Sequence, residues 1–335
     1  MASAPCSEAL CERRRGGHLK DASIAIIGAG LAGLAAARRL RAAGLDPILF
    51  EAAGKSGGRL SSEEVAGVPV DAGAVYVTAR EEPFKSFMQE AVFAGKATGW
   101  APSGRDSDEP WLIGLPSMDG LTDFAGKGLD IRTHTAVERI GRASEGYLLQ
   151  SNSAPVGPFD AVIVALPASA AEPLLHAHGK PFDRLSEVVM RPTIAGLFVF
   201  DGAVPITEDW ISRRGDLSVA IRNSSKAGRG DTESFVVHAA AGFSEAHFGA
   251  REDELSEQLL DLLAAEADGP LPPLMARKIR RWRQALVAEP AGEPCLVGAK
   301  GRLVACGDWC IAARSEAAFV SGTAAADAVL ASFSD

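Results

Sequence analysis

A glycine-rich turn between a short apolar run and a small-residue helix constrains this chain more than any other feature. Residues 23–27 read SIAII, which predicts a short strand buried on both faces. The turn GAGLAG spans residues 28–33, and the pattern after it predicts a helix that ends near Gly44. Residues 46–50, DPILF, predict a second strand, with Glu51 at its carboxyl end. This order is typical of a dinucleotide-binding α/β fold.

Each glycine of the turn has a predicted role. Gly28 permits the tight turn, Gly30 lets backbone amides approach a pyrophosphate, and Gly33 allows the helix to pack close to the sheet. The helix then begins at Leu31 and Ala32, where unpaired amides and a partial positive charge attract phosphate. We therefore expect all five residues to contact the cofactor.

The residues after the second strand narrow the choice of dinucleotide. Glu51 follows Gly33 by 18 residues and is placed to accept hydrogen bonds from the adenosine ribose. Its negative charge would repel a 2′-phosphate, which disfavours NADP. Gly57 and Gly58 then allow a second close pass of the backbone to phosphate, and Arg59 supplies a charged fork suited to phosphate oxygens.

Composition and charge exclude several classes of function. The 335 residues carry a net charge of −9 with no long basic run beyond residues 13–15, which argues against a nucleic-acid partner. The five cysteines are scattered without a histidine cluster, so we expect no metal site. No apolar run reaches the roughly 18 residues of a membrane span. We expect a cytoplasmic protein with no membrane contact, in which residues 1–20 form a disordered leader.

The remaining sequence predicts a second sheet and a return to the first. We expect a polar loop over residues 99–110. The other expected elements are strands between 129 and 151 around a Glu145-Gly146 turn, a buried strand at 161–166, strands at 197–200, 217–221 and 235–239, a helix at 251–266, a strand at 303–306 and a helix from Glu316 onward.

The Gly-Gly-Arg motif behind a dinucleotide fold resembles the FAD-binding signature of the amine-oxidase-like flavoproteins. Residues 70–80, VDAGAVYVTAR, resemble the segment of that group that passes beside the flavin ring. Residues 161–167, AVIVALP, are similar to its strand that ends in proline. Residues 306–309, CGDW, followed by 315–322, SEAAFVSG, resemble its C-terminal flavin motif. The resemblance implies non-covalently bound FAD.

The resemblance also implies which residues contact FAD. Gly307 and Asp308 would meet its ribityl and phosphate portion, and Val137 would hold the adenine by main-chain contact. The helix after Ser315 would direct its positive N-terminal end at the isoalloxazine. The residues expected beside the ring are Gly73, Ala74, Val75, Tyr76, Ala317 and Ala318.

Within this group, several strings are most similar to the renalases. They are DAGAVYVTAR at 71–80, IGLPSM at 113–118, RNSSKAGRGD at 222–231, VVHAA at 236–240 and CGDWC at 306–310. The likeness implies an FAD-dependent oxidase that takes a hydride from 2- or 6-dihydroNAD(P). Electrons then pass to dioxygen, giving β-NAD(P)⁺ and hydrogen peroxide. Asn223, His238 and Tyr76 are the expected catalytic residues, since the first two match polar positions lining the renalase substrate site.

The sequence departs from the renalase pattern in three places. Val75 stands where renalases commonly carry Gln, and Ala317 stands where they usually carry Gly. The region between Thr78 and Trp111 is also short. Two alternatives therefore stay open: a flavin amine oxidase or desaturase, and a flavin-binding protein that does not turn over.

Individual residues also have plainer interpretations. His238 and Tyr76 could be ordinary core residues, and the basic cluster 277–283 could be a solvated helix or strand edge. The alternative for that cluster is that one member, such as Arg281, receives a substrate phosphate.

The predicted fold class is α/β, with a Rossmann-like FAD-binding domain and an inserted α+β substrate domain built on a mixed sheet. We expect the first domain to comprise residues 21–80, 112–172 and 285–335. Residues 81–111 and 173–284 would form the second. The expected partners are a small-molecule substrate and dioxygen, and the sequence leaves the oligomeric state open.

Overall fold

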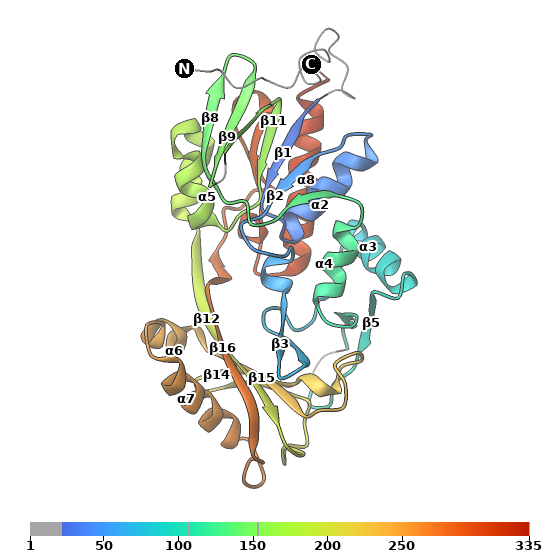
Figure 1. The fold of residues 1–335 in the computed structure, drawn as a ribbon, viewed down its shortest axis with the longest axis vertical. Coiled ribbons are helices and arrows are strands. Elements are labelled where there is room, and N and C mark those ends of the chain that lie inside the picture. The colour runs from blue at the N-terminus through green and yellow to red at the C-terminus, as the bar shows by residue number, and fades with distance from the viewer. Residues whose placement is uncertain (1–21, 106–107, 153, 335) are drawn as a thin grey trace.

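A computed structural model describes residues 22–105, 108–152 and 154–334, and the expected leader over 1–20 lies outside them. The chain forms an upper unit and a lower unit, joined by long strands (Figure 1). The upper unit contains both the blue N-terminal and the red C-terminal parts of the chain, as Figure 1 shows. We call it the dinucleotide-binding unit. Residues 130–175, in the middle of the chain, also lie in the upper unit, whereas the sheet of the lower, substrate unit is built from residues 189–289.

A six-stranded sheet is the centre of the dinucleotide-binding unit. Its order is β17-β18-β11-β1-β2-β7, and all neighbours are parallel except β17 and β18. The strands are β1 (Ile24–Ile27), β2 (Ile48–Phe50), β7 (Asp130–Arg132), β11 (Ala161–Val164), β17 (Leu296–Val297) and β18 (Leu303–Ala305). The two strands and the helix expected around the glycine turn are confirmed.

The two faces of this sheet are covered differently. Because side chains alternate along a strand, Ile24 and Ile26 face helices α2 (Leu31–Ala42) and α8 (Ser315–Ala331). Ala25 and Ile27 instead face a three-stranded sheet and α5 (Ala168–Leu175). The three strands are β8 (Val137–Ala143), β9 (Gly146–Ser151) and β10 (Pro155–Phe159). Burial on both faces explains the continuous apolar runs in the sequence.

The substrate unit is built on a five-stranded sheet with the order β13-β14-β15-β12-β16. The strands are β12 (Val189–Phe200), β13 (Trp210–Arg214), β14 (Leu217–Arg222), β15 (Ser234–Ala239) and β16 (Leu274–Glu289). Every neighbouring pair is antiparallel, where the sequence led us to expect a mixed sheet. Parallel pairing needs a crossover connection, and the links from β13 to β15 are too short to supply one.

One face of this sheet packs on helices and the other on the dinucleotide-binding unit. Phe235 and Val237 of β15 contact a cluster that includes α7 (Glu252–Ala264), with α6 (Ala241–His247) beside it. Val236 lies on the opposite face, in one core cluster with Ala72 and other residues of the dinucleotide-binding unit. We call this second side the inner face of the substrate sheet.

Smaller elements connect the two units. They are α3 (Glu82–Phe93), α4 (Asp119–Gly126) and the hairpins β3–β4 (Ser62–Val65, Val68–Asp71) and β5–β6 (Ala97–Trp100, Trp111–Gly114). Helix α3 packs by Phe87 against Phe124 of α4 and Phe319 of α8. The β5–β6 hairpin contains Gly99 and Trp100, so the loop expected from residue 99 begins at Ala101 instead. Cross-strand pairing of Trp100 with Trp111 explains the difference.

Candidate active site

The two glycine motifs of the N-terminal region lie side by side. The amide of Gly57 donates to the carbonyl of Ala29 at 2.9 Å, and Gly30 and Gly57 form a parallel bridge. The Cβ that an alanine would add at Gly58 points at Cα of Gly30 from 3.5 Å. Residues 27 positions apart in the chain therefore form one glycine-lined edge at the carboxyl end of β1.

The start of α2 is shaped to receive an anion. Gly30 is its N-cap residue, and the first turn contains no acidic side chain and no side-chain cap. A Cβ at Gly30 would meet nothing within 4 Å, so this side of the turn is open. A Cβ at Gly33 would overlap the carbonyl oxygen of Gly28, so glycine is required there for helix α2 to approach the turn. The unpaired amides of the first helical turn can therefore be approached past Gly30, where no side chain stands in the way.

The carboxylate of Glu51 is fixed at the end of β2. Its Oε2 accepts from the amide of Ala29 at 2.8 Å, and its Oε1 accepts from the amide of Ala53 at 2.9 Å. Thr135, two residues before Val137, donates its amide to the carbonyl of Glu51 at 2.8 Å. This brings the start of β8 to the edge where Glu51 would bind a ribose, and remaining carboxylate lone pairs are available for hydroxyl donors.

Arg59 and Asp308 join the two ends of the chain. The guanidinium donates to both carboxylate oxygens, at 2.8 and 2.6 Å, and also to the carbonyl of Ala285 at 3.1 Å. Asp308 is buried, and it also accepts the amide of Trp309 at 3.0 Å. The neighbouring Gly307 leaves room for the Trp309 ring, which a Cβ would meet. Arg59, which we expect to bind phosphate, therefore lies beside Asp308, which we expect to contact the ribityl portion of FAD.

Helix α8 lies next to the glycine-lined edge, which we also call the cofactor edge. It packs so closely on α2 that a Cβ at Gly322 would overlap the carbonyl oxygen of Ala32. Ala317 is buried in its first turn, and Ala318 is partly buried. Glu316, which we did not single out from the sequence, is buried too, and its Oε1 accepts the amides of Arg80 and Glu81 at 2.6 and 2.7 Å. It therefore fixes the segment that follows Tyr76.

The segment expected beside the flavin ring passes between Arg59 and the substrate sheet. The amide of Ala74 donates to the carbonyl of Arg59 at 2.8 Å, and a Cβ at Gly73 would overlap that same carbonyl. The indole of Trp282 in β16 donates to the carbonyl of Ala72 at 2.8 Å. Val75 is buried in the shared core. Glycine at 73 is thus needed for a close contact between backbones.

Tyr76 belongs to an aromatic cluster at the junction of the units. Its ring stacks on Trp111 with centroids 3.9 Å apart, and Trp210 meets Trp111 edge-on at 4.7 Å. Trp100 lies 5.9 Å from Trp111. Burial, and then the charge of Glu109, raise the pKa of Tyr76 above its usual value, so the phenol stays protonated. The packed rings of these four aromatic residues form an apolar wall, which we call the aromatic wall.

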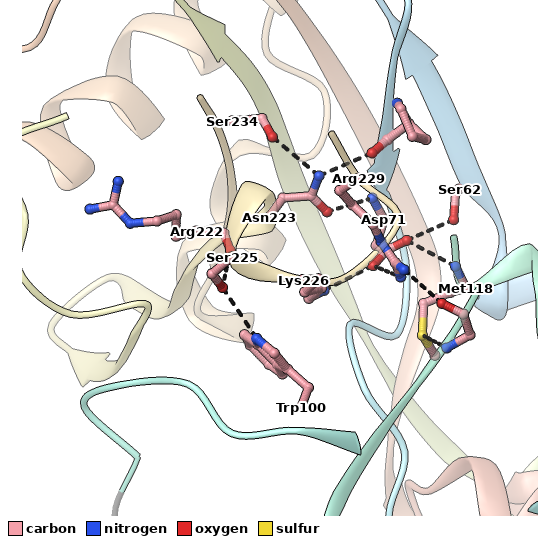
Figure 2. Close-up of polar contacts among 12 residues, drawn as sticks. Ser62, Asp71, Trp100, Met118, Arg222, Asn223, Ser225, Lys226, Arg229 and Ser234 are labelled. Carbon is pink, nitrogen blue, oxygen red and sulfur yellow. Dashed lines mark hydrogen bonds and ion pairs between the residues drawn. The ribbon is translucent and has the colours of Figure 1, made fainter. Parts of the chain in front are cut away.

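A buried ionic network lies next to Trp100 of the aromatic wall, with Lys226 5.0 Å from the centre of its ring (Figure 2). Asp71 accepts from Lys226 at 2.9 Å and from Arg229 at 2.7 Å, and all three side chains are fully buried. Burial alone would raise the pKa of Asp71, but the two cations outweigh it and the pKa lies below its usual value. Burial lowers the pKa of Lys226 to about 8. The segment 222–231 therefore ties the substrate unit to Asp71 at the end of β4. We call this ionic network the clamp between the units.

Asn223 is part of this network rather than of an open wall. Its Oδ1 accepts the amide of Asp71 at 3.3 Å, and its Nδ2 donates to Pro69 and Ser234 at 3.0 and 3.2 Å. The side chain is fully buried (Figure 2). Its amide groups are thus already bonded within the protein, and a direct contact with substrate stays a prediction.

His238 lies on the inner face, in register with Ala195 and Val219. Its Nε2 is buried and has no hydrogen-bond partner. Burial, assisted by the charge of Lys226, lowers the pKa of His238 to about 4, so the imidazole is neutral near pH 7. A neutral ring without a partner can donate or accept one hydrogen bond to a bound molecule.

Because side chains alternate along β16, the basic cluster 277–283 is divided between the two faces of the substrate sheet. Arg277 and Arg281 pair with Asp253 and Glu252 on the helix side. Lys278 and Arg280 pair with Glu63 on the inner face, where Arg280 also lies 4.5 Å from the ring of Trp282. β16 is the edge strand of its sheet, which agrees with the plainer of the two interpretations.

The described thiols do not form a reactive centre. Burial raises the pKa of Cys295 to about 11 and that of Cys310 to about 12, and it raises the pKa of Cys306 well above the ordinary range. In residues 22–105, 108–152 and 154–334, no group of three or more His, Cys, Asp or Glu side chains is arranged to hold a metal ion. Across the same residues, no helix has the length and apolar character that crossing a membrane requires.

The glycine-lined edge fits FAD, because two backbone segments, an open helix start and a fixed carboxylate converge there from distant parts of the sequence. These features define a dinucleotide-binding site, and the family matches that follow make it that of an FAD-dependent oxidoreductase. A model of the NAD(P)-binding Rossmann-like domain matches residues 26–91, and one for flavin-containing amine oxidoreductases matches residues 114–330. The chain belongs to the flavin-containing amine oxidoreductase family.

Individual relatives match over short segments. Mitochondrial protoporphyrinogen oxidase of Nicotiana tabacum is 45% identical over 64 residues, which are 19% of this chain and 13% of that protein. Hydroxyneurosporene desaturase of Rubrivivax gelatinosus is 42% identical over 106 residues, 32% of this chain and 20% of the relative. The matches thus cover far less than two thirds of either relative.

A solved structure matches nearly the whole chain. Cyclohexylamine oxidase from Brevibacterium oxydans IH-35A superposes with a TM-score of 0.72 and 12% identity, covering 94% of this chain and 100% of that one. At this identity the likeness establishes the fold alone. The α/β fold class expected from the sequence is confirmed, and so is the cofactor, FAD.

Proposed function

We propose that the protein is an oxidase of the renalase type, which oxidises 2- or 6-dihydroNAD(P) and passes the electrons to dioxygen. The observation that carries the proposal is the unpartnered, neutral His238 on the inner face. A dihydronicotinamide is already a hydride donor, so its oxidation needs orientation of the ring more than proton transfer. His238 supplies one hydrogen bond for a carboxamide or ribose hydroxyl.

The electrostatics of the inner face favour this substrate over an amine. Lys226 is buried close enough to depress the pKa of His238, and Arg280 lies on the same face of the sheet. Lys226 and Arg229 share the carboxylate of Asp71, and Lys278 and Arg280 share that of Glu63, so each group keeps one excess positive charge. This excess would repel an alkyl amine, which arrives as a cation. A dihydropyridine ring is uncharged, and the phosphates of its nucleotide are attracted to the same cations.

Bound FAD would accept the hydride and return the electrons to dioxygen. The chain's own part is to bind and orient. Gly30 and the start of α2 would hold the pyrophosphate, and Glu51 the adenosine ribose. The stacked Tyr76 and Trp111 would limit the access of water to the ring, since Trp111 is buried and Tyr76 partly buried in an apolar cluster.

Anaerobic mixing of the holoprotein tests the proposal. We expect 6-dihydroNAD to bleach the flavin band at about 450 nm, and air to restore it with release of hydrogen peroxide. β-NADH and benzylamine are the matched controls and should bleach it far more slowly. His238→Ala should raise the KM for 6-dihydroNAD while the spectrum of bound FAD stays unchanged. Bleaching by benzylamine alone would overturn the proposal.

A flavin amine oxidase or desaturase is the second candidate. It is favoured by the aromatic cluster, in which Tyr76 stacks on Trp111 and Trp210 stands edge-on. Such rings suit an apolar or cationic substrate. A flavin-binding protein without turnover is the third, and bleaching by neither kind of reductant would support it.

A further inference from the structure

A pocket lies at the end of the dinucleotide-binding unit that is farthest from the substrate unit. Its volume is about 810 Å³. One wall is the turn of the β8–β9 hairpin at residues 142–147, and the other is the loop 300–302 with the last turn of α8. In Figure 1 the hairpin and this end of α8 lie at the top, while the substrate sheet lies at the bottom. No residue expected to contact FAD lines this pocket.

Three cations line this pocket, and none of them has an acidic partner among the residues that the structure describes. Arg142 lies over the ring of Tyr147 at 5.5 Å, Arg302 lies over the ring of Phe333 at 4.3 Å, and Lys300 is exposed. Within the described residues, none of the three forms a salt bridge, whereas most arginines of the chain do. In a chain with a net charge of −9, three such cations around one hollow favour an anionic ligand.

The backbone of the loop presents Lys300 in an unusual conformation. Lys300 has a φ of 65° and Gly301 a φ of 67°, so two consecutive residues are left-handed. Residues other than Gly, Asn and Asp rarely adopt this left-handed backbone conformation, and those that do concentrate at functional sites. The carbonyl of Arg302 accepts the amide of Val162 at 2.8 Å, which fixes the loop to β11.

The carboxylates of the pocket do not cancel the positive charge. Glu145 and Asp160 both line it. The Oδ2 of Asp160 accepts from the amide and the hydroxyl of Ser23 at 2.9 and 3.0 Å, so that carboxylate is already bonded within the protein. Three cations against two carboxylates leave the pocket with a positive balance.

We propose that this pocket binds a small ligand bearing a phosphate or diphosphate group, at the same time as FAD and independently of the reaction. Guanidinium groups bind phosphate oxygens as planar forks, and a lysine adds a point charge beside them. The hollow is large enough for a nucleotide, because ligand pockets commonly span about 300 to 1,000 Å³.

Calorimetric titration of the FAD-saturated holoprotein tests this inference, because the pyrophosphate-binding turn is then filled. Inorganic pyrophosphate is the probe, at low ionic strength, and we expect saturable binding with one site per chain. The triple substitution Arg142→Ala, Lys300→Ala and Arg302→Ala should weaken binding at least about tenfold. Arg213→Ala is the matched control and should change nothing, since Arg213 is an exposed cation with a left-handed φ of 56° in the substrate unit.

Two further variants make the result decisive. Glu145→Gln removes a negative charge from the pocket and should tighten pyrophosphate binding about threefold. Lys300→Ala alone, on an exposed loop, should fold normally and weaken binding by a similar factor. Absence of binding, unchanged affinity in the triple variant, or weaker binding by Glu145→Gln would each overturn the inference. The inference would also be overturned if the protein co-sedimented with phosphatidylglycerol vesicles but did not bind pyrophosphate, since the cations would then contact a lipid surface.

Discussion

The cofactor edge and the inner face of the substrate sheet are built from different chemical groups. At the edge, the surface is formed by backbone, because glycines such as Gly30 and Gly57 have no side chain to cover it. At the inner face, buried side chains do so, with Asp71 bonded to Lys226 and Arg229. On the backbone surface an added side chain either disturbs the packing behind it or blocks the ligand, whereas among buried ion pairs the loss of one charge leaves its partner unpaired. The two regions should therefore fail in different ways.

The largest effect is expected from alanine at Gly33. Its Cβ would overlap the carbonyl oxygen of Gly28, so α2 must move from the sheet, and we expect a loss of about 4 kcal/mol or more. The same change at Gly30 should leave the fold intact, because its Cβ meets nothing within 4 Å. It should instead weaken FAD binding about tenfold or more, since the added methyl occupies the approach to the pyrophosphate.

Urea unfolding of the apoprotein and fluorescence titration with FAD separate these two effects. Gly242→Ala in α6, where a Cβ also meets nothing within 4 Å, is the control and should leave FAD affinity unchanged and raise stability by at most about 1 kcal/mol. Equal FAD affinity in the Gly30→Ala variant and the wild type would mean that the pyrophosphate does not bind at this turn.

The next largest effect is expected at Asp71. Asp71→Asn leaves Lys226 and Arg229 buried without their carboxylate, which should cost about 3 to 5 kcal/mol. Asp253→Asn removes an exposed partner of Arg277 and should cost less than about 1 kcal/mol. Urea unfolding at saturating FAD measures both. If the two variants lose equal stability, the buried network does not act as the clamp between the units.

The same contrast explains how much of the molecule the sequence predicts. Glycine spacing reports on backbone geometry, which is local, so the turn at Gly28, the start of α2 and the position of Glu51 follow from a few consecutive residues. The second close pass of the backbone, at Gly57 and Gly58, is also predicted, but the hydrogen bond from Gly57 to the carbonyl of Ala29 is not.

The side-chain surface could not be predicted in this way. Asn223 is a polar residue in the expected substrate loop, but its bonds to Pro69 and Asp71 depend on a contact across more than 150 residues. Glu316 was overlooked because a carboxylate in the first turn of a helix is ordinary in sequence. Only the folded chain brings it to the amides of Arg80 and Glu81.

A smaller effect is expected from the titration of His238. Its pKa is about 4 in the folded protein and about 6.5 in an unfolded chain, so the unfolded state binds the proton first. The stability from this group is complete above pH 6.5 and is lost as the pH falls toward 4, by about 3 kcal/mol. His238→Gln should flatten the acid limb of stability against pH by that amount, measured by urea unfolding. Parallel acid limbs in the two proteins would place His238 in contact with water.

The smallest effect is expected at Arg281, on the far side of β16 from the inner face. Arg281 pairs with Glu252 and donates to the carbonyl of Ala250, so Arg281→Ala should change the KM for 6-dihydroNADP by less than about twofold. Arg280→Ala removes a cation from the inner face and should raise that KM several-fold. Steady-state peroxide assays compare the two. The reverse order would mean that substrate reaches the helix side of the sheet, and the division of β16 into two chemically distinct faces would be wrong.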